Sequence, residues 1–366
     1  ALVTEPTAPS RPPTVPSPPP TVPRDLPAAR RPRRFPAFWL ALIALLAGAG
    51  VLALALSGGS HAGNSGASST PAATPATPKV VIHGTGLTEG LTVKLSSPPG
   101  AISADAQGVW VSLPDRGAVV HLDPSTGNQR LLTTGGIPTA IAGGPSAVWV
   151  AGTASRSLAQ FSGDSGAQVA VAKLPGTPTA IAVDPHDSSA WVADSSGAIS
   201  HVAAGSTAVG MPAQTNPPAT SIGFGEGWVW ATNGAANGLI RVSQDTSGSS
   251  TVFPVGPDPV SVTFDQGVWT AHANGHVTRF DPRLNKLHVN TDVALTSELD
   301  AIAATDPGPY VWAVSKSAKT LYRITNAPAP AVTGTVVFAS PPVALAVSGS
   351  SVWVASQDGN ITEVRF

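Results

Sequence analysis

The segment IPTAIAGGPSAVWVAG, residues 137–152, decides the fold class, because similar segments recur along the chain. A proline opens its first short apolar run, and a tryptophan lies inside the second. Both runs are short and bounded by glycine and proline, as β-strands usually are. The segment therefore predicts two neighbouring strands of a repeated sheet.

The tryptophan of this segment recurs seven times, at intervals of 39, 42, 39, 39, 43 and 41 residues. A period near 40 residues with strand-like composition is typical of β-propeller blades. An indole at one repeat position can wedge between neighbouring sheets, so we expect all seven tryptophans in the core. They are Trp110, Trp149, Trp191, Trp230, Trp269, Trp312 and Trp353.

Two further strands complete each unit. A turn with glycine or asparagine follows the tryptophan run, and then an alternating run such as residues 277–280 follows. A turn such as Asp281-Pro282 leads into a fourth strand. These turn residues accept positive φ or preset φ near −65°. Four short antiparallel strands make one blade.

The ends of the repeats predict how the ring closes. The seventh unit stops at Phe366, after its third strand, whereas residues 91–99 match the outer-strand segment 335–342 of the sixth unit. An open ring would expose two sheet edges and the apolar faces of its terminal blades. We therefore expect residues 91–96 to complete the seventh blade of an all-β, seven-bladed β-propeller that spans residues 91–366.

The chain before the repeats divides into three zones. Residues 1–34 are rich in proline and hold six arginines, so we expect a disordered segment. Residues 35–56 carry no charge and, as a helix, would span about 30 Å of hydrocarbon. We expect residues 35–56 to form one transmembrane helix. The Gly/Ser/Pro-rich residues 57–90 predict a flexible stalk.

The charge distribution gives the expected orientation in a membrane. An arginine cluster at residues 30–34 precedes the apolar stretch, and the next lysine or arginine is Lys79. The positive-inside rule then places the N-terminus in the cytoplasm and the propeller outside the cell. The chain begins at Ala1 and its only methionine is Met211, so we expect a fragment or a processed product.

The overall composition excludes several classes of function. The 366 residues include no cysteine, which excludes disulfides, thiolate metal sites and cysteine nucleophiles. Charged residues make up only 11%, and the net charge is −1. No basic field is present, and we expect no nucleic-acid partner.

The pattern Gly-x-Pro-x-x-Ile-Ala, then Val-Trp-Val-Ala, then Gly-x-Ile-x-x-Val resembles streptogramin-lyase-like and NHL-type propellers over about 275 residues. The resemblance implies the fold, but fold does not fix chemistry. For the lyases it also implies a histidine, a glutamate and magnesium at one mouth of the central channel. Two sets of loops would form such a mouth here.

The first set leads into the innermost strands and carries no histidine. The second set is the turn after each tryptophan strand, where only His272 could act as a base and no glutamate occurs. His272 and His276 are separated by a turn, so we do not expect them to form a metal pair. We therefore expect no catalytic residue, no metal site and no cofactor.

Mixed charges at these turns predict contact with a polar ligand, a peptide or a cell-wall component such as a glycan. Hydrated loops alone would explain the same pattern. The candidate ligand-binding residues are Asp115, Arg116, Asp194, Asn233, His272, Lys316 and Asp358.

The order of the zones resembles the C-terminal half of actinobacterial membrane serine/threonine kinases. That resemblance implies an external sensor whose kinase domain lies upstream, and no kinase motif occurs in this chain. A flexible tether transmits rotation poorly, so signalling would require a change in association, such as homodimer formation. The alternatives are a magnesium-dependent enzyme of the lyase type and a structural or adhesion propeller.

Overall fold

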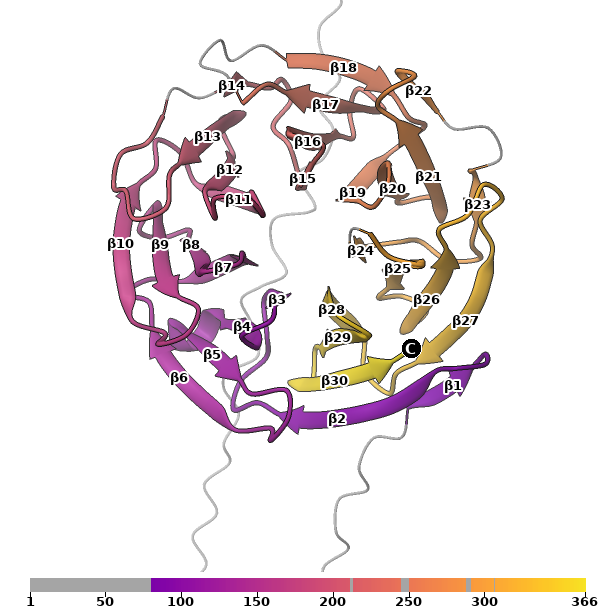
Figure 1. Cartoon of the computed structure of the whole chain (residues 1–366), viewed down its shortest axis with the longest axis horizontal. Coiled ribbons are helices and arrows are strands. Elements are labelled where there is room, and N and C mark those ends of the chain that lie inside the picture. Colours follow the sequence, from indigo (N-terminus) through magenta and orange to yellow (C-terminus); the bar gives the residue numbers. More distant parts are fainter. Residues whose placement is uncertain (1–79, 211–212, 245–249, 288–290, 306) are drawn as a thin grey trace, which may run out of the picture. The chain divides into compact units, whose positions relative to one another are not determined.

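The computed structural model describes residues 80–366, except 211–212, 245–249, 288–290 and 306. These residues form seven antiparallel sheets arranged around one axis (Figure 1). The chain is thus a seven-bladed β-propeller, as the repeats predict. The expected disordered segment and membrane helix, residues 1–34 and 35–56, lie outside the described residues.

The first three blades follow one another along the chain, each running from an inner to an outer strand. Blade 1 comprises β3 (Ile102–Ala104), β4 (Val109–Leu113), β5 (Ala118–Leu122) and β6 (Gln129–Thr133). Blade 2 comprises β7 (Pro138–Gly143), β8 (Ala147–Gly152), β9 (Ser157–Ser162) and β10 (Gln168–Lys173). Blade 3 comprises β11 (Pro178–Val183), β12 (Ala190–Asp194), β13 (Ala198–Val202) and β14 (Ala213–Gln214).

Blades 4 and 5 repeat this order, and in blade 5 two short strands pair with the third strand. Blade 4 comprises β15 (Ile222–Gly225), β16 (Trp228–Asn233), β17 (Gly238–Val242) and β18 (Ser250–Pro254). Blade 5 comprises β19 (Pro259–Phe264), β20 (Val268–His272), β21 (His276–Asp281), β22 (Lys286–Leu287) and β23 (Val293–Ala294).

Blades 6 and 7 each recruit a strand from the start of the described chain. Blade 6 comprises β24 (Ala301–Ala304), β25 (Tyr310–Ser315), β26 (Thr320–Thr325), β27 (Val332–Val337) and β1 (Val81–His83). Blade 7 comprises β28 (Pro342–Ser348), β29 (Ser351–Ser356), β30 (Asn360–Arg365) and β2 (Thr88–Lys94).

The ring closes as predicted, because β2 pairs with β30. Thr92 lies opposite Thr362 and Val93 opposite Ile361, while the backbone N–H of Leu95 donates to the Gly359 carbonyl at 2.8 Å. The paired strand begins at residue 88, earlier than expected, and the register shifts between residues 89 and 92. This closure pairs both edges that an open ring would expose.

The start of the propeller lies before the predicted boundary at residue 91. β1 adds a fifth strand to β27, with Val81 opposite Val337 and His83 opposite Thr335. Residues 81–83, which we expected in the flexible stalk, are therefore part of a sheet. Their apolar run is too short to predict a strand from sequence. The segment becomes a strand because it pairs with the free edge of β27.

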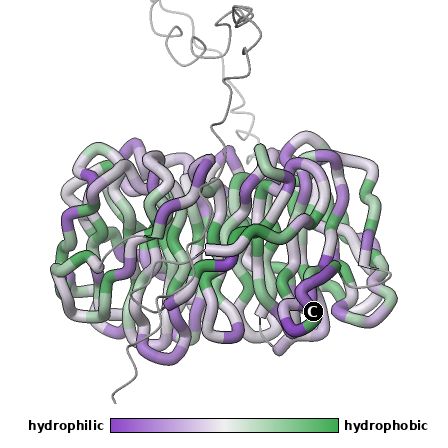
Figure 2. The backbone as a smooth tube through the Cα atoms, turned by 90° about the horizontal axis from the view of Figure 1, so that it is seen from above, coloured by the Kyte–Doolittle hydropathy of each residue, from purple (hydrophilic) through white to green (hydrophobic). Residues whose placement is uncertain are grey.

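The tryptophans form the core between blades. All seven repeat tryptophans are at most 5% exposed. Trp149 of blade 2, for example, packs with Ala190, Val192 and Val202 of blade 3. Each indole thus joins its own blade to the next. Hydrophobic segments run through the sheets, whereas hydrophilic residues lie at many turns (Figure 2).

The turns define two faces of the ring. In a four-stranded antiparallel blade, the turn between the second and third strands lies at the same end as the link to the next blade. Thr134 of the link after blade 1 donates its backbone N–H to Gly117 of such a turn, at 3.1 Å. We call this end the Trp-turn face and the other end the opposite face. None of the described residues forms a helix long and apolar enough to cross a membrane.

Candidate functional site

The seven residues expected to bind a ligand all lie on the Trp-turn face, at the turn after the second strand of their blades. Blade 1 supplies Asp115 and Arg116, and blades 3 to 7 supply one residue each, while blade 2 supplies none. In the part of the chain that the structure describes, no hydrogen bond or ion pair joins any two of the seven. They surround the axis as separate turns rather than converging on one point.

Four of the seven present their side chains to solvent. Asp115 and Arg116 are exposed in a 3₁₀ turn that Gly117 ends at φ 57°, a conformation that favours glycine. Lys316 is exposed and its Nζ lies 3.7 Å from Oδ1 of Asp300. Asp358 is exposed, and its Oδ2 accepts from the Asn360 amide at 2.7 Å. This face therefore offers both signs of charge to solvent.

Asp194 and Asn233 are instead directed into their own turns, where they are 2% and 1% exposed. Oδ1 of Asp194 accepts from the backbone N–H groups of Ser196 at 2.8 Å and Ala198 at 3.1 Å. Oδ1 of Asn233 accepts from the Ala236 N–H at 3.0 Å. Both side chains stabilise the turn that carries them, a common role for Asp and Asn.

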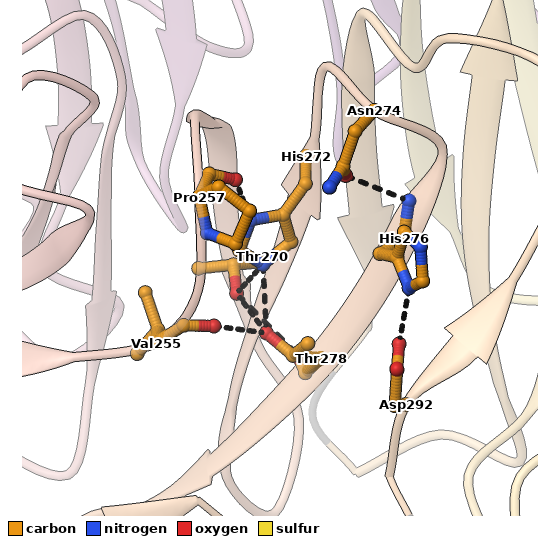
Figure 3. Close-up of polar contacts among 8 residues, drawn as sticks. All are labelled: Val255, Pro257, Thr270, His272, Asn274, His276, Thr278 and Asp292. Carbon is orange, nitrogen blue, oxygen red and sulfur yellow. Dashed lines mark hydrogen bonds and ion pairs between the residues drawn. The ribbon is translucent and has the colours of Figure 1, made fainter.

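His272 is 1% exposed and both of its ring nitrogens are engaged (Figure 3). Nδ1 lies 2.7 Å from the Pro257 carbonyl, and Nε2 lies 2.8 Å from Oγ1 of Thr278 and 3.2 Å from Oγ1 of Thr270. A carbonyl only accepts hydrogen bonds, so Nδ1 must carry the proton. Sequence reasoning missed both threonines, which become partners only through the pairing of β20 with β21.

The charge state of His272 follows from its surroundings. Burial lowers its pKa, and the neighbouring His276 acts in the same direction, while the Pro257 carbonyl, Asp292 and Asp258 oppose them. The ring is therefore neutral at pH 7, with Nε2 accepting from a threonine hydroxyl. Nothing reaches Nε2 from solvent, so His272 is poorly placed to take a proton from a ligand.

His276 turns away from His272. Its Nδ1 lies 2.6 Å from Oδ1 of Asp292, and both side chains are partly exposed (Figure 3). The two histidines thus have separate partners, as expected from the turn between them. Over the described residues, no three histidine, aspartate or glutamate side chains are grouped so that they could hold a metal ion.

Comparison with known proteins gives likenesses in structure. No protein-family model and no curated protein matches the chain. A streptogramin B lyase structure matches with a TM-score of 0.64 at 17% identity, over 78% of this chain and 97% of that chain. The virginiamycin B lyase from Staphylococcus aureus matches with a TM-score of 0.64 at 16% identity, over 79% of this chain and 100% of that chain.

A third match is a catalytically inactive variant of the Staphylococcus aureus virginiamycin B lyase with quinupristin. Its TM-score is 0.63 at 16% identity, over 78% of this chain and 100% of that chain. At these identities the likeness shows the fold alone. Because one fold hosts many functions, it does not assign an activity. The seven candidate residues do not fit the histidine, glutamate and magnesium that the resemblance implies. None of the seven is a glutamate, and His272 is buried with both ring nitrogens hydrogen-bonded.

Proposed function

We propose that this chain is an extracytoplasmic binding module, anchored in the cell membrane by residues 35–56, that receives a polar ligand on its Trp-turn face. The burial of His272 carries the choice of binding over catalysis. Its Nε2 lone pair, the one able to take a proton, faces the hydroxyls of Thr278 and Thr270, and the residue is only 1% exposed, so a ligand has no direct access to it.

The charges of the Trp-turn face support a polar ligand. Asp115, Arg116, Lys316 and Asp358 are all exposed there, in a chain with only 11% charged residues. Carboxylates and cations spaced around one ring suit a ligand with several hydrogen-bonding groups, such as a peptide or a glycan of the cell wall. Asp300 belongs with this set, because its carboxylate holds Lys316 in place.

The order of zones along the sequence supports a sensor role, with a kinase domain upstream as the partner. In such a protein the ligand would act through association of two copies, since a Gly/Ser/Pro-rich tether is too flexible to pass on a rotation. The measurable consequence is a ligand-dependent shift of the full chain from monomer to dimer.

The test is binding of soluble cell-wall peptides and glycan fragments to the full chain, measured by calorimetry. We expect a variant with Asp115→Asn, Arg116→Gln, Lys316→Gln and Asp358→Asn to bind at least about tenfold more weakly, because charge-assisted hydrogen bonds are lost. The matched control carries Arg130→Gln and Asp164→Asn, two exposed charges away from these turns. Equal binding by the four-residue variant and the control would refute this face as the site.

An enzyme of the lyase type is the second candidate, favoured by the structural likeness alone. Incubating the full chain with quinupristin and magnesium, followed by mass spectrometry, separates the two. We expect the quinupristin to remain intact. Consumption that His272→Gln abolishes would establish catalysis and remove the binding-only proposal.

A further inference from the structure

Two adjoining hollows open on the opposite face, where blades 3, 4 and 5 meet beside the axis. The first has a volume of about 400 Å³ and is lined chiefly by the inner strands β11, β15 and β19. The second has a volume of about 550 Å³ and extends toward the turn after β21. Both are bordered by His186, Glu226 and Phe264, so they form one bipartite hollow.

The inner half of this hollow is apolar. Ile222, Phe224 and Val262 line it, together with Gly223 and Gly225. A Cβ at Gly225 would lie 2.0 Å from the Phe264 ring, so glycine is required there for the ring to pack. A Cβ at Gly223 would meet Val262 in ordinary van der Waals contact, at 3.4 Å from its carbonyl oxygen, so a side chain could be accommodated there and would extend into the hollow that Gly223 lines.

Blade 4 differs from the other six blades at one position that lines the hollow. Gly223 lies opposite the blade tryptophan Trp230 across the first strand pair. The equivalent position carries a side chain in every other blade. Those residues are Ser103, Ala142, Ala182, Thr263, Ala303 and Ala346. Gly223 is thus a departure from the repeat at a position that lines the hollow.

The outer half is polar and is lined by two guanidinium groups and by two carboxylates, Glu226 and Asp281; Oδ1 of Asp281 accepts from the backbone N–H of Arg283 at 2.9 Å. Arg283 is 80% exposed and its Nη2 lies 2.8 Å from Oε1 of Glu226. Arg279 is half-buried, donates to the Gln266 carbonyl, and lies 5.5 Å from the Trp269 ring. Among the described residues, Arg279 forms no ion pair, and its buried Nε has no hydrogen-bond partner.

A half-buried cation without a carboxylate partner is costly, and an arriving anion would relieve that cost. The planar guanidinium matches a carboxylate in two parallel hydrogen bonds. The apolar half lies directly beside it, across Phe264. One molecule could therefore place an apolar group near the axis and a carboxylate on Arg279.

We propose that this hollow binds an amphipathic carboxylate, with its apolar group between β15 and β19 and its carboxylate on Arg279. Two kinds of molecule carry an apolar group beside a carboxylate: the C-terminal end of a peptide whose last residue is apolar, and a small apolar acid. The site lies on the face away from the turns of the proposed function, so each can fail without the other.

Calorimetry on the full chain with four probes tests the proposal. The probes are N-acetyl-leucyl-phenylalanine, its C-terminal amide, 4-phenylbutyrate and 4-phenylbutanol. We expect an acid to bind at least about tenfold more tightly than its neutral partner, the gain from a charge-assisted pair. Preference for the peptide acid assigns the site to chain ends, and preference for phenylbutyrate assigns it to small acids. Equal binding of each acid and its neutral partner would overturn the proposal.

Matched variants locate the site. Arg279→Gln should weaken binding of the acid at least about tenfold, whereas Arg279→Lys should restore part of it. Gly223→Val should weaken acid and neutral probes alike, because it fills the apolar half. The controls are Arg130→Gln and Ala142→Val, an exposed arginine and the equivalent inner position in blade 2. Unchanged acid binding in both Arg279→Gln and Gly223→Val would exclude this hollow.

Discussion

At the scale of single residues, one repeat position explains the cohesion of the ring. Every blade tryptophan is buried against the next blade, but its partner across the sheet differs from blade to blade. His121 stacks on Trp110 with ring centroids 4.1 Å apart, whereas Arg323 stands opposite Trp312. The indole thus performs the shared structural task, and the residue beside it is free to vary.

Trp149→Ala is expected to destabilise the propeller strongly. Trp149 is fully buried and its Nε1 donates to the Ser188 carbonyl of blade 3 at 2.8 Å. Removing a buried tryptophan costs about 3–5 kcal/mol. Trp228→Ala is the matched control, because this half-buried tryptophan lies outside the repeat, beside Arg241. Urea unfolding should show the larger loss for Trp149→Ala, and equal losses would contradict the role of the indole between blades.

The lowered pKa of His272 predicts a pH dependence of stability. Because burial depresses the pKa in the folded state, the unfolded chain binds the proton more tightly. Stability is then intact above the ordinary histidine pKa of about 6.5 and declines as the pH falls below it. His276, Asp258 and Asp292 also influence the pKa of His272, and all three are present in both the unchanged chain and the variant tested below.

His272→Gln tests that dependence. Between about pH 7 and about pH 5, the melting temperature of the unchanged chain should fall more than that of the variant. His201 also has a pKa lowered by burial, and it contributes equally to both proteins. Parallel pH profiles for the two proteins would show that His272 takes no part.

At the scale of elements, closure of the ring depends on β2. This strand pairs residue 88 with residue 365, and its Val93, together with Leu95 just after it, is buried in one cluster with Ile361. Its sequence predicted the pairing because its outer-strand pattern matches β27. The pairing of β1 was not predicted, since a three-residue strand has too little pattern to be recognised.

A disulfide between Thr92→Cys and Thr362→Cys should lock the closure. These residues oppose each other in the β2–β30 pair, and opposed residues lie about 4.5–5.5 Å apart at Cα, within reach of a disulfide. The chain has no cysteine of its own, so the crosslink is unique. Oxidation should raise the melting temperature, because the bond closes a very long loop.

The control for this crosslink pairs Thr92→Cys with Thr251→Cys, which lies on β18 of blade 4. Intact-mass measurement of the alkylated protein, with and without prior reduction, should show no intramolecular disulfide in this control. If the control pair crosslinks as readily as Thr92 with Thr362, the predicted position of β2 is wrong.

At the scale of the whole molecule, the two faces of the propeller differ in chemistry. The Trp-turn face carries exposed charges on separate turns, and the opposite face has a hollow that pairs an apolar chamber with Arg279. The two proposed sites therefore call for different ligands. A chain altered at the four exposed turn residues should lose binding of cell-wall fragments yet keep the acid preference of the hollow.

The sequence by itself determined the sheet class, the seven units, the buried tryptophans and the strand that closes the ring. Those features follow from a period and from strand patterns, which are local and repeated. Only the tertiary structure decided which turn residues face solvent, because Asp194, Asn233 and His272 turn inward to satisfy backbone and threonine groups. It alone also revealed the hollow, since a cavity is the space left between side chains of separate blades, and no stretch of sequence encodes that space.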